Sequence, residues 1–504
     1  MSHAELKIVK AQSAGKLSLP AKIHPAIEGF LNANQDTIFN LADAFGSPLN
    51  IMFPQVISEN IAAFQNIYKK HGITGRVFFT SKPNKSQAVI RQAAMQDVNV
   101  DVSSEQALKN ILGYGFDASR IECTGPKNSE YLTLAVQQGT IINADNMEEI
   151  DRALALHETL GKQGKLRVFL RLCGFHSDRV KFTSQDGTFG VHVDRADEML
   201  AFLQERIHKI DFLGFSYYWS GASQEQRMVA IENGLQLTLR AVEMGLAPKG
   251  LNIGGGFHVQ YAADRESWLR YIDNVKLSLR DTDSSMTWND NGLGYRNEGG
   301  IIKGAPNYMD HCAPYTGAAD FDQLLQLPLA AFDGMTAADI LRDCMLDLYI
   351  EPGRALLDQC GVTMGRVNFT KPSTHGETLV ALDMNRSNMH STHQKLLTDP
   401  IVLYRDEASC DEAETGVYYY GNLCVSYDII TYQKSFPRKL PKSGDLVIFV
   451  NTAPYIMDFI ESETLHQNTA EKVAIIQDGE NYRWFKDAKY RPLEHNPLSQ
   501  KQEG

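Results

Sequence analysis

Three short segments of the chain combine residue types that could act together on one reactive ligand. The first is SKPN at residues 81–84, which follows the strand-like run VFFT. A lysine at the end of a buried strand is partly desolvated, and its neutral amine can then attack an aldehyde. Lys82 has this position, and Lys85 is a rival deeper in the same loop. Considered alone, either lysine is better explained as a solvated loop residue.

The second segment is the triplet Gly254, Gly255 and Gly256, which follows the run LNI. Consecutive glycines let the backbone approach an anion closely and direct its N–H groups toward it. The triplet lacks the GxGxxG spacing of a dinucleotide site. It therefore indicates a phosphate-binding loop, although a tight turn would use the same residues.

The third segment is EPGR, which follows the run LDLYI and contains Glu351 and Arg354. A carboxylate at a strand end can accept a hydrogen bond from a pyridinium N–H and keep that proton in place. The guanidinium of Arg354 offers a charged fork to a phosphate or carboxylate. An ion pair within a turn would explain this motif equally well if it stood alone.

All three segments follow strand-like runs that alternate with helical patterns. From about residue 49, PLNIMFP precedes ISENIAAFQNIYKKHG, VFFTS precedes KSQAVIRQAAMQD, and VNVDVS precedes SEQALKNILGYG. Repeated units of this length indicate a parallel sheet with helical crossovers. Eight or so units within about 300 residues favour an α/β fold with a closed (β/α)8 barrel of TIM type over an open doubly wound sheet. The three segments would then meet at the catalytic rim of the barrel.

The pattern of expected secondary structure changes after about residue 360, where short strand-like runs are separated by Gly, Pro and Asn turns. We predict a C-terminal β-rich domain, barrel-like or sandwich-like, over residues 359–504. The barrel is expected over residues 49–358, and residues 1–48 are expected to be an N-terminal lead-in that joins the β domain, with residues 1–25 forming a loose segment. A Gly-rich and aromatic-rich insert at 281–335 is long for a connection, which suggests a lid, an interface element or a disordered segment. Its aromatic residues argue against disorder.

Composition excludes several classes of function. The net charge of -12 gives no general attraction to nucleic acid or to an anionic membrane. The 7 cysteines are scattered and lack CxxC spacing, so neither a disulfide framework nor a metal site is expected. The N-terminus lacks the apolar region of a signal peptide, and no apolar run is long enough to span a membrane. We therefore expect a cytoplasmic protein.

The three segments, in this order, resemble the barrel-type pyridoxal 5′-phosphate (PLP) dependent decarboxylases of the alanine racemase-like fold, which act on diaminopimelate, ornithine or arginine. The resemblance runs from about residue 48 to about residue 475. It implies that PLP forms a Schiff base with Lys82 in FTSKPN. It further implies these cofactor contacts: Asp101 in VNVDVSSEQAL, Arg171 in LRVFLRL, Tyr218 in GFSYYWSGAS, Gly254, Gly255 and Gly256, Glu351, Gly353 and Arg354 in YIEPGRAL, and Tyr455 in NTAPYIMDF.

In the β-rich region, GNLCVSYDII resembles the family's GPLCESxD segment. In that family the cysteine comes from the other subunit and is implicated in protonating the product carbon. The resemblance therefore implies a homodimer with shared active sites, in which Cys424 is the second catalytic residue. It also places Asp428 and Asn388 at the amino-acid substrate.

Departures from the family pattern bear on the substrate. Tyr218 stands where the family has a histidine stacked on the cofactor ring, and a tyrosine can still stack there. The phosphate-binding serine after it is either Ser220 or Ser223. Val425 stands where the family has an acidic residue that recognises a distal amino group. We therefore expect decarboxylation of a modified or conjugated diamino acid rather than of ornithine or lysine.

Two other functions fit the same residues. The first is an amino-acid racemase of the same fold, although the Cys424 segment and the EPGR motif favour decarboxylation. The second is a non-catalytic PLP-binding protein, although barrel-type proteins of that kind typically lack a β domain.

Overall fold

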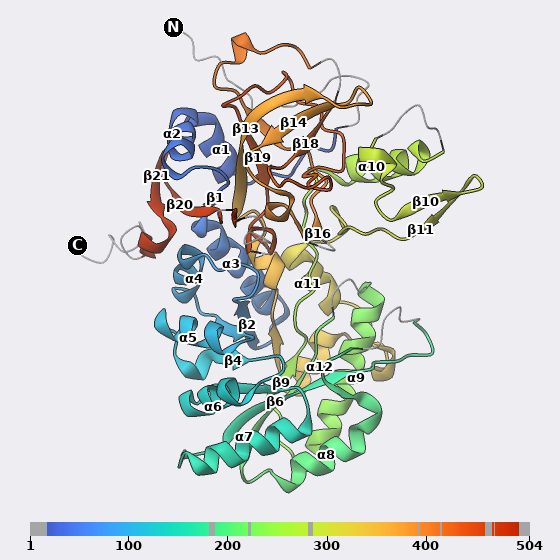
Figure 1. The fold of residues 1–504 in the computed structure, drawn as a ribbon. Helices are drawn as coiled ribbons and strands as arrows, with labels where there is room; N and C mark the ends of the chain where they lie inside the picture. The colour runs from blue at the N-terminus through green and yellow to red at the C-terminus, as the bar shows by residue number, and fades with distance from the viewer. Residues whose placement is uncertain are drawn as a thin grey trace.

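The computed structural model describes residues 18–180, 187–219, 223–280, 286–391, 394–413, 416–458, 466–467 and 469–492. Two β-structures dominate it (Figure 1): a parallel barrel in the lower half of the view and a mainly antiparallel sheet in the upper half. The polypeptide crosses between them twice, once near its N-terminus and once after the last strand of the barrel.

The barrel is a closed ring of parallel strands. Pairing runs β2-β12-β9-β8-β6 on one side and β2-β3-β4-β5 on the other, and a β5–β6 pairing closes the ring. The short β7 (Val191–His192) extends this sheet beside β6. The predicted (β/α)8 barrel is confirmed. Its strands are β2 (Gly75–Thr80), β3 (Asn99–Val102), β4 (Ile121–Cys123), β5 (Ile141–Ala144), β6 (Leu166–Cys173), β8 (Ile210–Ser216), β9 (Gly250–Asn252) and β12 (Asp347–Ile350).

Helices surround the ring and return the chain to the start of each following strand. Several begin directly after a strand because a side chain caps the first turn: Ser86, Ser104, Asn128 and Asn146 each accept a backbone N–H hydrogen bond there. Such short connections hold the residues that follow each strand at one rim. The helices are α3 (Pro54–His71), α4 (Gln87–Ala94), α5 (Glu105–Gly113), α6 (Ser129–Gln138), α7 (Met147–Thr159), α8 (Ala196–Glu205), α9 (Gln224–Glu243), α11 (Gly317–Leu325) and α12 (Ala337–Asp343).

The second sheet confirms the predicted β-rich C-terminal domain. Its order is β17-β19-β13-β1-β20-β21, and β14 and β18 extend it beside β13. Its strands are β1 (Leu49–Met52), β13 (Gly361–Pro372), β14 (Thr378–Leu382), β17 (Ile401–Leu403), β18 (Val417–Tyr420), β19 (Leu446–Val450), β20 (Glu471–Asp478) and β21 (Asn481–Lys486).

The N-terminal part of the chain also belongs to this second sheet. The strand β1, expected to begin the barrel at residue 49, pairs instead with β13 and β20. A short strand whose four residues are all buried suits the interior of either sheet, so its composition could not assign it. The N-terminal lead-in, beyond the segment expected to be loose, contains two helices, α1 (Pro25–Ala33) and α2 (Gln35–Phe45). The Phe30 ring of α1 lies 5.5 Å from the Tyr482 ring of β21.

The predicted insert at 281–335 divides into two parts, apart from residues 281–285, which lie outside the described part of the chain. Its later part contains the barrel helix α11. Its earlier part forms the hairpin β10 (Tyr295–Glu298) and β11 (Ile301–Gly304), which projects at the right edge of Figure 1 beside α10 (Arg265–Ser278). His311 anchors this part, because its ring stacks 4.8 Å from Trp268.

Candidate active site

Lys82 lies just beyond β2, in a loop that both domains hold. The backbone N–H of Ser81 donates to the carbonyl of Asp101. The fully buried Asn84 donates from Nδ2 to the carbonyl of Ala453 at 2.8 Å. The Lys82 side chain is exposed in the single chain, so this barrel alone does not supply the desolvation expected of it. Its Nζ lies 5.9 Å from the ring centroid of Tyr218, which follows β8 and is 48% exposed.

Two carboxyl groups, those of Asp101 and Glu351, belong to the same electrostatic cluster as Lys82 and Arg171. Glu351 is only partly exposed, and the protein around its carboxyl, together with Asp101, raises its pKa to about 8. Burial also raises the pKa of Asp101, while a hydrogen bond from Thr124 and the charges of Lys82 and Arg171 oppose the rise. The barrel therefore brings together four predicted residues that come from β3, β6 and the ends of β2 and β12.

The glycine loop closely approaches the neighbouring strand ends. A Cβ on Gly254 would lie 2.5 Å from the carbonyl oxygen of Tyr217, and one on Gly255 would lie 2.3 Å from that of Glu351. Gly254 also has a φ of 63°, in the left-handed region. Gly256 follows with a φ of 85°. No side chain fits the first two positions, so the loop offers bare backbone at the rim.

The EPGR segment and the Tyr455 turn face each other beside this loop. Gly353 has a φ of 49°, and a Cβ there would lie 3.6 Å from the Tyr455 hydroxyl. The Arg354 guanidinium carbon lies 4.8 Å from the centroid of the Tyr455 ring, and its Nη1 donates to the Tyr261 hydroxyl at 2.9 Å. Burial raises the pKa of Tyr455, which keeps its hydroxyl protonated. Of the two candidate phosphate serines, Ser223 caps α9 and Ser220 lies outside the described residues.

These residue types fit PLP. An amine is present for its aldehyde, a carboxyl for its ring nitrogen, and a bare glycine cradle with an arginine and a phenol for its phosphate. The fit rests on the close backbone approach at Gly254 and Gly255, where a Cβ would collide with the carbonyl oxygens of Tyr217 and Glu351, so that only bare backbone can stand there.

The predicted residues of the C-terminal domain are arranged differently. Cys424 is exposed. The carboxylate of Asp428 is buried and accepts two backbone N–H bonds, from Leu423 and Arg386, each at 2.7 Å. Asp428 therefore braces the Cys424 segment from within. Asn388 is buried in a turn that packs against residues 456–458, directly after the Tyr455 turn.

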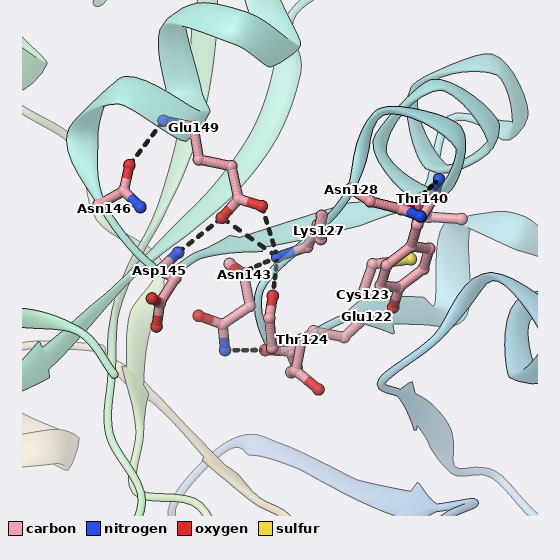
Figure 2. Close-up of polar contacts among 12 residues, drawn as sticks. Glu122, Cys123, Thr124, Lys127, Asn128, Thr140, Asn143, Asp145, Asn146 and Glu149 are labelled. Atoms are coloured by element: carbon pink, nitrogen blue, oxygen red, sulfur yellow. Dashed lines mark hydrogen bonds and ion pairs between the residues drawn. The ribbon is translucent and has the colours of Figure 1, made fainter. Parts of the chain in front are cut away.

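Lys127 was not selected from the sequence, although TGPKNSE also follows a strand, as SKPN does. Its ammonium is buried and donates to the carbonyls of Gly125 at 2.9 Å and Asn143 at 2.7 Å (Figure 2). It also lies 3.2 Å from the carboxylate of Glu149. Burial lowers the pKa of Lys127, and the charge of Glu149 opposes this change. Because these partners fully engage its ammonium, Lys127 is a structural lysine that joins the β4 and β5 loops.

Polar residues inside the barrel were also not predicted. Asn252, at the end of β9, donates from Nδ2 to Glu351 at 2.8 Å and accepts the Gly254 N–H at its Oδ1 at 2.9 Å. It thus connects the glycine loop to the carboxyl group. Little in the sequence indicated a role for Asn252, because LNIGGG has the pattern of a buried strand followed by a turn.

None of the helices that the structure describes is long and apolar enough to cross a membrane. Within the described residues, no group of three or more His, Cys, Asp or Glu side chains is arranged to hold a metal ion.

Comparison with known proteins supports the resemblance. Residues 55–286 match the sequence model for the pyridoxal binding domain of pyridoxal-dependent decarboxylases. The chain is 27% identical over 470 residues to protein y4yA of Sinorhizobium fredii, covering 92% of this chain and 95% of that protein. It is 22% identical over 475 residues to the diaminopimelate decarboxylase of Staphylococcus aureus, covering 92% and 97%.

Solved structures share the fold at low identity. Diaminopimelate decarboxylase from Helicobacter pylori complexed with L-lysine superposes with a TM-score of 0.61 and 14% identity, covering 90% of this chain and 95% of that one. Arginine decarboxylase from Paramecium bursaria Chlorella virus superposes with a TM-score of 0.62 and 17% identity, covering 88% and 100%. These structures confirm the expected fold, and the match of residues 55–286 confirms the expected resemblance to pyridoxal-dependent decarboxylases and with it the expected PLP cofactor.

Proposed function

We propose, for this barrel-type PLP-dependent amino-acid decarboxylase, that the cofactor is held through a Schiff base to Lys82 and that the substrate is a modified or conjugated diamino acid. The observation that carries the proposal is the position of Lys82. Its amine stands at the rim beside Asp101, Arg171 and Glu351, and it faces the Tyr218 ring.

Each remaining part of the cofactor has a matching group. When bound, PLP draws electrons from the bond to the departing carboxylate. Glu351 would accept a hydrogen bond from the protonated ring nitrogen and so keep the proton on that nitrogen. Tyr218 would cover one face of the ring. The residues that would bind the phosphate are Gly254, Gly255, Gly256, Gly353, Arg354 and Tyr455. Asp101 and Arg171 would set the charge around Lys82.

The substrate proposal rests on the surroundings of Cys424. Val425 offers no negative charge for a distal ammonium group. The guanidinium carbon of Arg386 lies instead 4.6 Å from the centroid of the Tyr427 ring, so a cation and an aromatic ring flank this segment. The buried Nδ2 of Asn388 has no hydrogen-bond partner among the described residues. Such groups suit a tail that ends in a carbonyl, carboxylate or other acceptor.

The exposure of Lys82, Tyr218 and Cys424 supports a homodimer in which the partner's copy of Cys424 completes the site. There Cys424 would deliver the proton that replaces the departing carboxylate, as a general acid. We further propose that the protein works in the cytoplasm.

Borohydride reduction followed by peptide mass spectrometry tests the linkage, and the adduct should lie on Lys82. An adduct on Lys85, or none, would refute that assignment. Carbon dioxide release should then be compared for ornithine, lysine, diaminopimelate and their N-acylated derivatives. Ordinary turnover of the free diamino acids would refute the substrate proposal. Loss of optical rotation without carbon dioxide release would indicate the racemase, and trapped cofactor without either reaction would indicate a non-catalytic protein.

A further inference from the structure

Glu122, on β4, is a fully buried carboxyl group that no cation neutralises directly. Its Oε1 accepts a hydrogen bond from Asn143 Nδ2 at 2.5 Å (Figure 2), and Asn252 Nδ2 lies 3.3 Å from each of its oxygens. Within the described residues it forms no ion pair, since the nearby Lys127 is bound to Glu149 and two carbonyls. A buried carboxyl with only amide partners is far more stable when neutral.

The amide of Asn252 connects this acid to Glu351. Its Nδ2 carries two N–H groups and lies 2.8 Å from Glu351 and 3.3 Å from Glu122, so it can donate to both carboxyl groups at once. The amide cannot turn over without loss, because its Oδ1 accepts the N–H of Gly254. On the far side, Asn143 is oriented in the same way, since its Oδ1 accepts from Ser216. A polar chain therefore crosses the barrel interior from β8 through β5, β4 and β9 to the end of β12.

Charge decides which of the two acids ionises. Glu351 lies near Lys82 and Arg171, and both cations favour its charged form. Burial and the charges of Glu351 and Asp101 raise the pKa of Glu122 well above its ordinary value. Two carboxyl groups that share one amide do not readily carry two charges. Glu351 therefore ionises first, and Glu122 keeps its proton.

We propose that Glu122 is a positioning residue which, as a neutral acid, accepts the second N–H of the Asn252 amide and so keeps the first N–H directed at Glu351, which leaves the proton at the ring nitrogen of the cofactor. This inference rests on the proposed function and deepens it. Glu122 acts only through Asn252. A hydrogen bond to a carboxylate favours its charged form, so loss of this bond would make Glu351 a weaker acid that competes with the ring nitrogen for the proton.

The test is a pH titration of full-length protein loaded with 15N-labelled PLP, in which the nitrogen resonance reports protonation of the ring. Glu122→Leu leaves the second N–H of Asn252 without its acceptor and loosens the amide from Glu351, so Glu351 competes better for the proton and the ring-nitrogen midpoint should move to lower pH by about one unit, roughly the effect of one hydrogen bond to a charged group. Asn252→Ala removes the bond to Glu351 and should move the midpoint in the same direction. Glu122→Gln, the neutral isostere, should titrate like the wild type.

A matched control separates this effect from a loss of stability. Glu149→Gln alters another buried carboxyl that does not bond to Asn252, so it should lower the melting temperature and leave the midpoint unchanged. The inference is overturned if Glu122→Gln shifts the midpoint as much as Glu122→Leu, or if neither Glu122→Leu nor Asn252→Ala shifts it. Should Glu122→Leu not fold, the other two variants decide the question.

Failure of the proposed function would look different. A wild-type protein that yields no borohydride adduct on Lys82 overturns the function and this inference together. If the wild type yields the adduct on Lys82 but the variants leave the titration midpoint unshifted, only this inference is overturned.

Discussion

The amine of Lys82 lies 5.9 Å from the centroid of the Tyr218 ring, although their strands β2 and β8 are separated in the sheet by β12 and β9. Closure of the barrel therefore turns two loop residues toward each other across its mouth. A phenol at this position supplies an aromatic face without the imidazole whose charge ordinarily changes near neutral pH. In the proposed site, an aromatic ring and not an imidazole therefore faces the cofactor on the Tyr218 side.

Removal of that ring should weaken cofactor binding. We expect Tyr218→Ala to raise the dissociation constant of PLP about fivefold, because an aromatic stack contributes about 1 kcal/mol. Tyr218→Phe keeps the ring face and should bind PLP like the wild type. Fluorescence titration measures both constants. Equal loss in the two variants would mean that the hydroxyl, and not the ring, is what matters.

The cofactor-free protein should lose stability as the pH rises from 4.5 to about 8. The folded state raises the pKa of Glu351, so it holds this proton more tightly than the unfolded chain does. The contribution is complete below pH 4.5 and is lost as the pH rises through about 8. Glu351→Gln carries no charge, so its melting temperature should fall less over this window in scanning calorimetry. Parallel curves for the two proteins would contradict the assignment.

Gly255→Ala should disrupt the cradle. Its Cβ would stand 2.3 Å from the carbonyl oxygen of Glu351, so the ends of β9 and β12 must separate. Overpacking of this kind costs about 1–3 kcal/mol, and we expect PLP affinity to fall about tenfold or more. Gly113→Ala is the control, because nothing lies within 4 Å of a Cβ there. Unchanged affinity in Gly255→Ala would show that the loop does not hold the cofactor.

Lys127 should matter for folding rather than for the cofactor linkage. Lys127→Met leaves the buried Glu149 carboxylate without its cation, which should cost about 3–5 kcal/mol in chemical denaturation. The double variant Lys127→Met with Glu149→Leu should regain much of that loss, since no buried charge then remains. Borohydride should still trap PLP on Lys82 in both proteins. Loss of the adduct in a folded Lys127→Met protein would argue against this separation of roles.

Shared active sites predict complementation between two inactive proteins. Lys82→Ala and Cys424→Ala should each lose most activity alone. Unfolding and refolding them together should restore part of it, because a mixed dimer has one site with both residues intact. Carbon dioxide release measures the recovery, and each variant refolded alone is the control. No recovery from verified mixed dimers would place both residues in sites built from a single chain.

Local patterns carry much of the fold. Alternation of short apolar runs with helical periodicity, and the caps Ser86, Ser104, Asn128 and Asn146, depend only on neighbouring residues. The barrel, the β-rich domain and the rim segments around Lys82, Gly254–Gly256 and Glu351 were therefore predictable. The assignment of β1 was not, because its four buried residues satisfy the interior of either sheet, and only long-range pairing with β13 and β20 chooses between them.

The amino-acid sequence by itself determined the kind of chemistry, since a lysine, a glycine triplet and EPGR at strand ends, in this order, resemble the motifs of the PLP-dependent decarboxylases. Only the tertiary structure decided which buried groups act together. Lys82 and Lys127 both follow strands, but Lys127 is engaged by Gly125, Asn143 and Glu149 and Lys82 is not. Glu122 and Glu351 lie far apart in the chain and share Asn252 only because β4, β9 and β12 line one closed barrel. Hydrogen bonds act over about 3 Å, so their partners are set by where the strands meet in space and not by spacing along the chain.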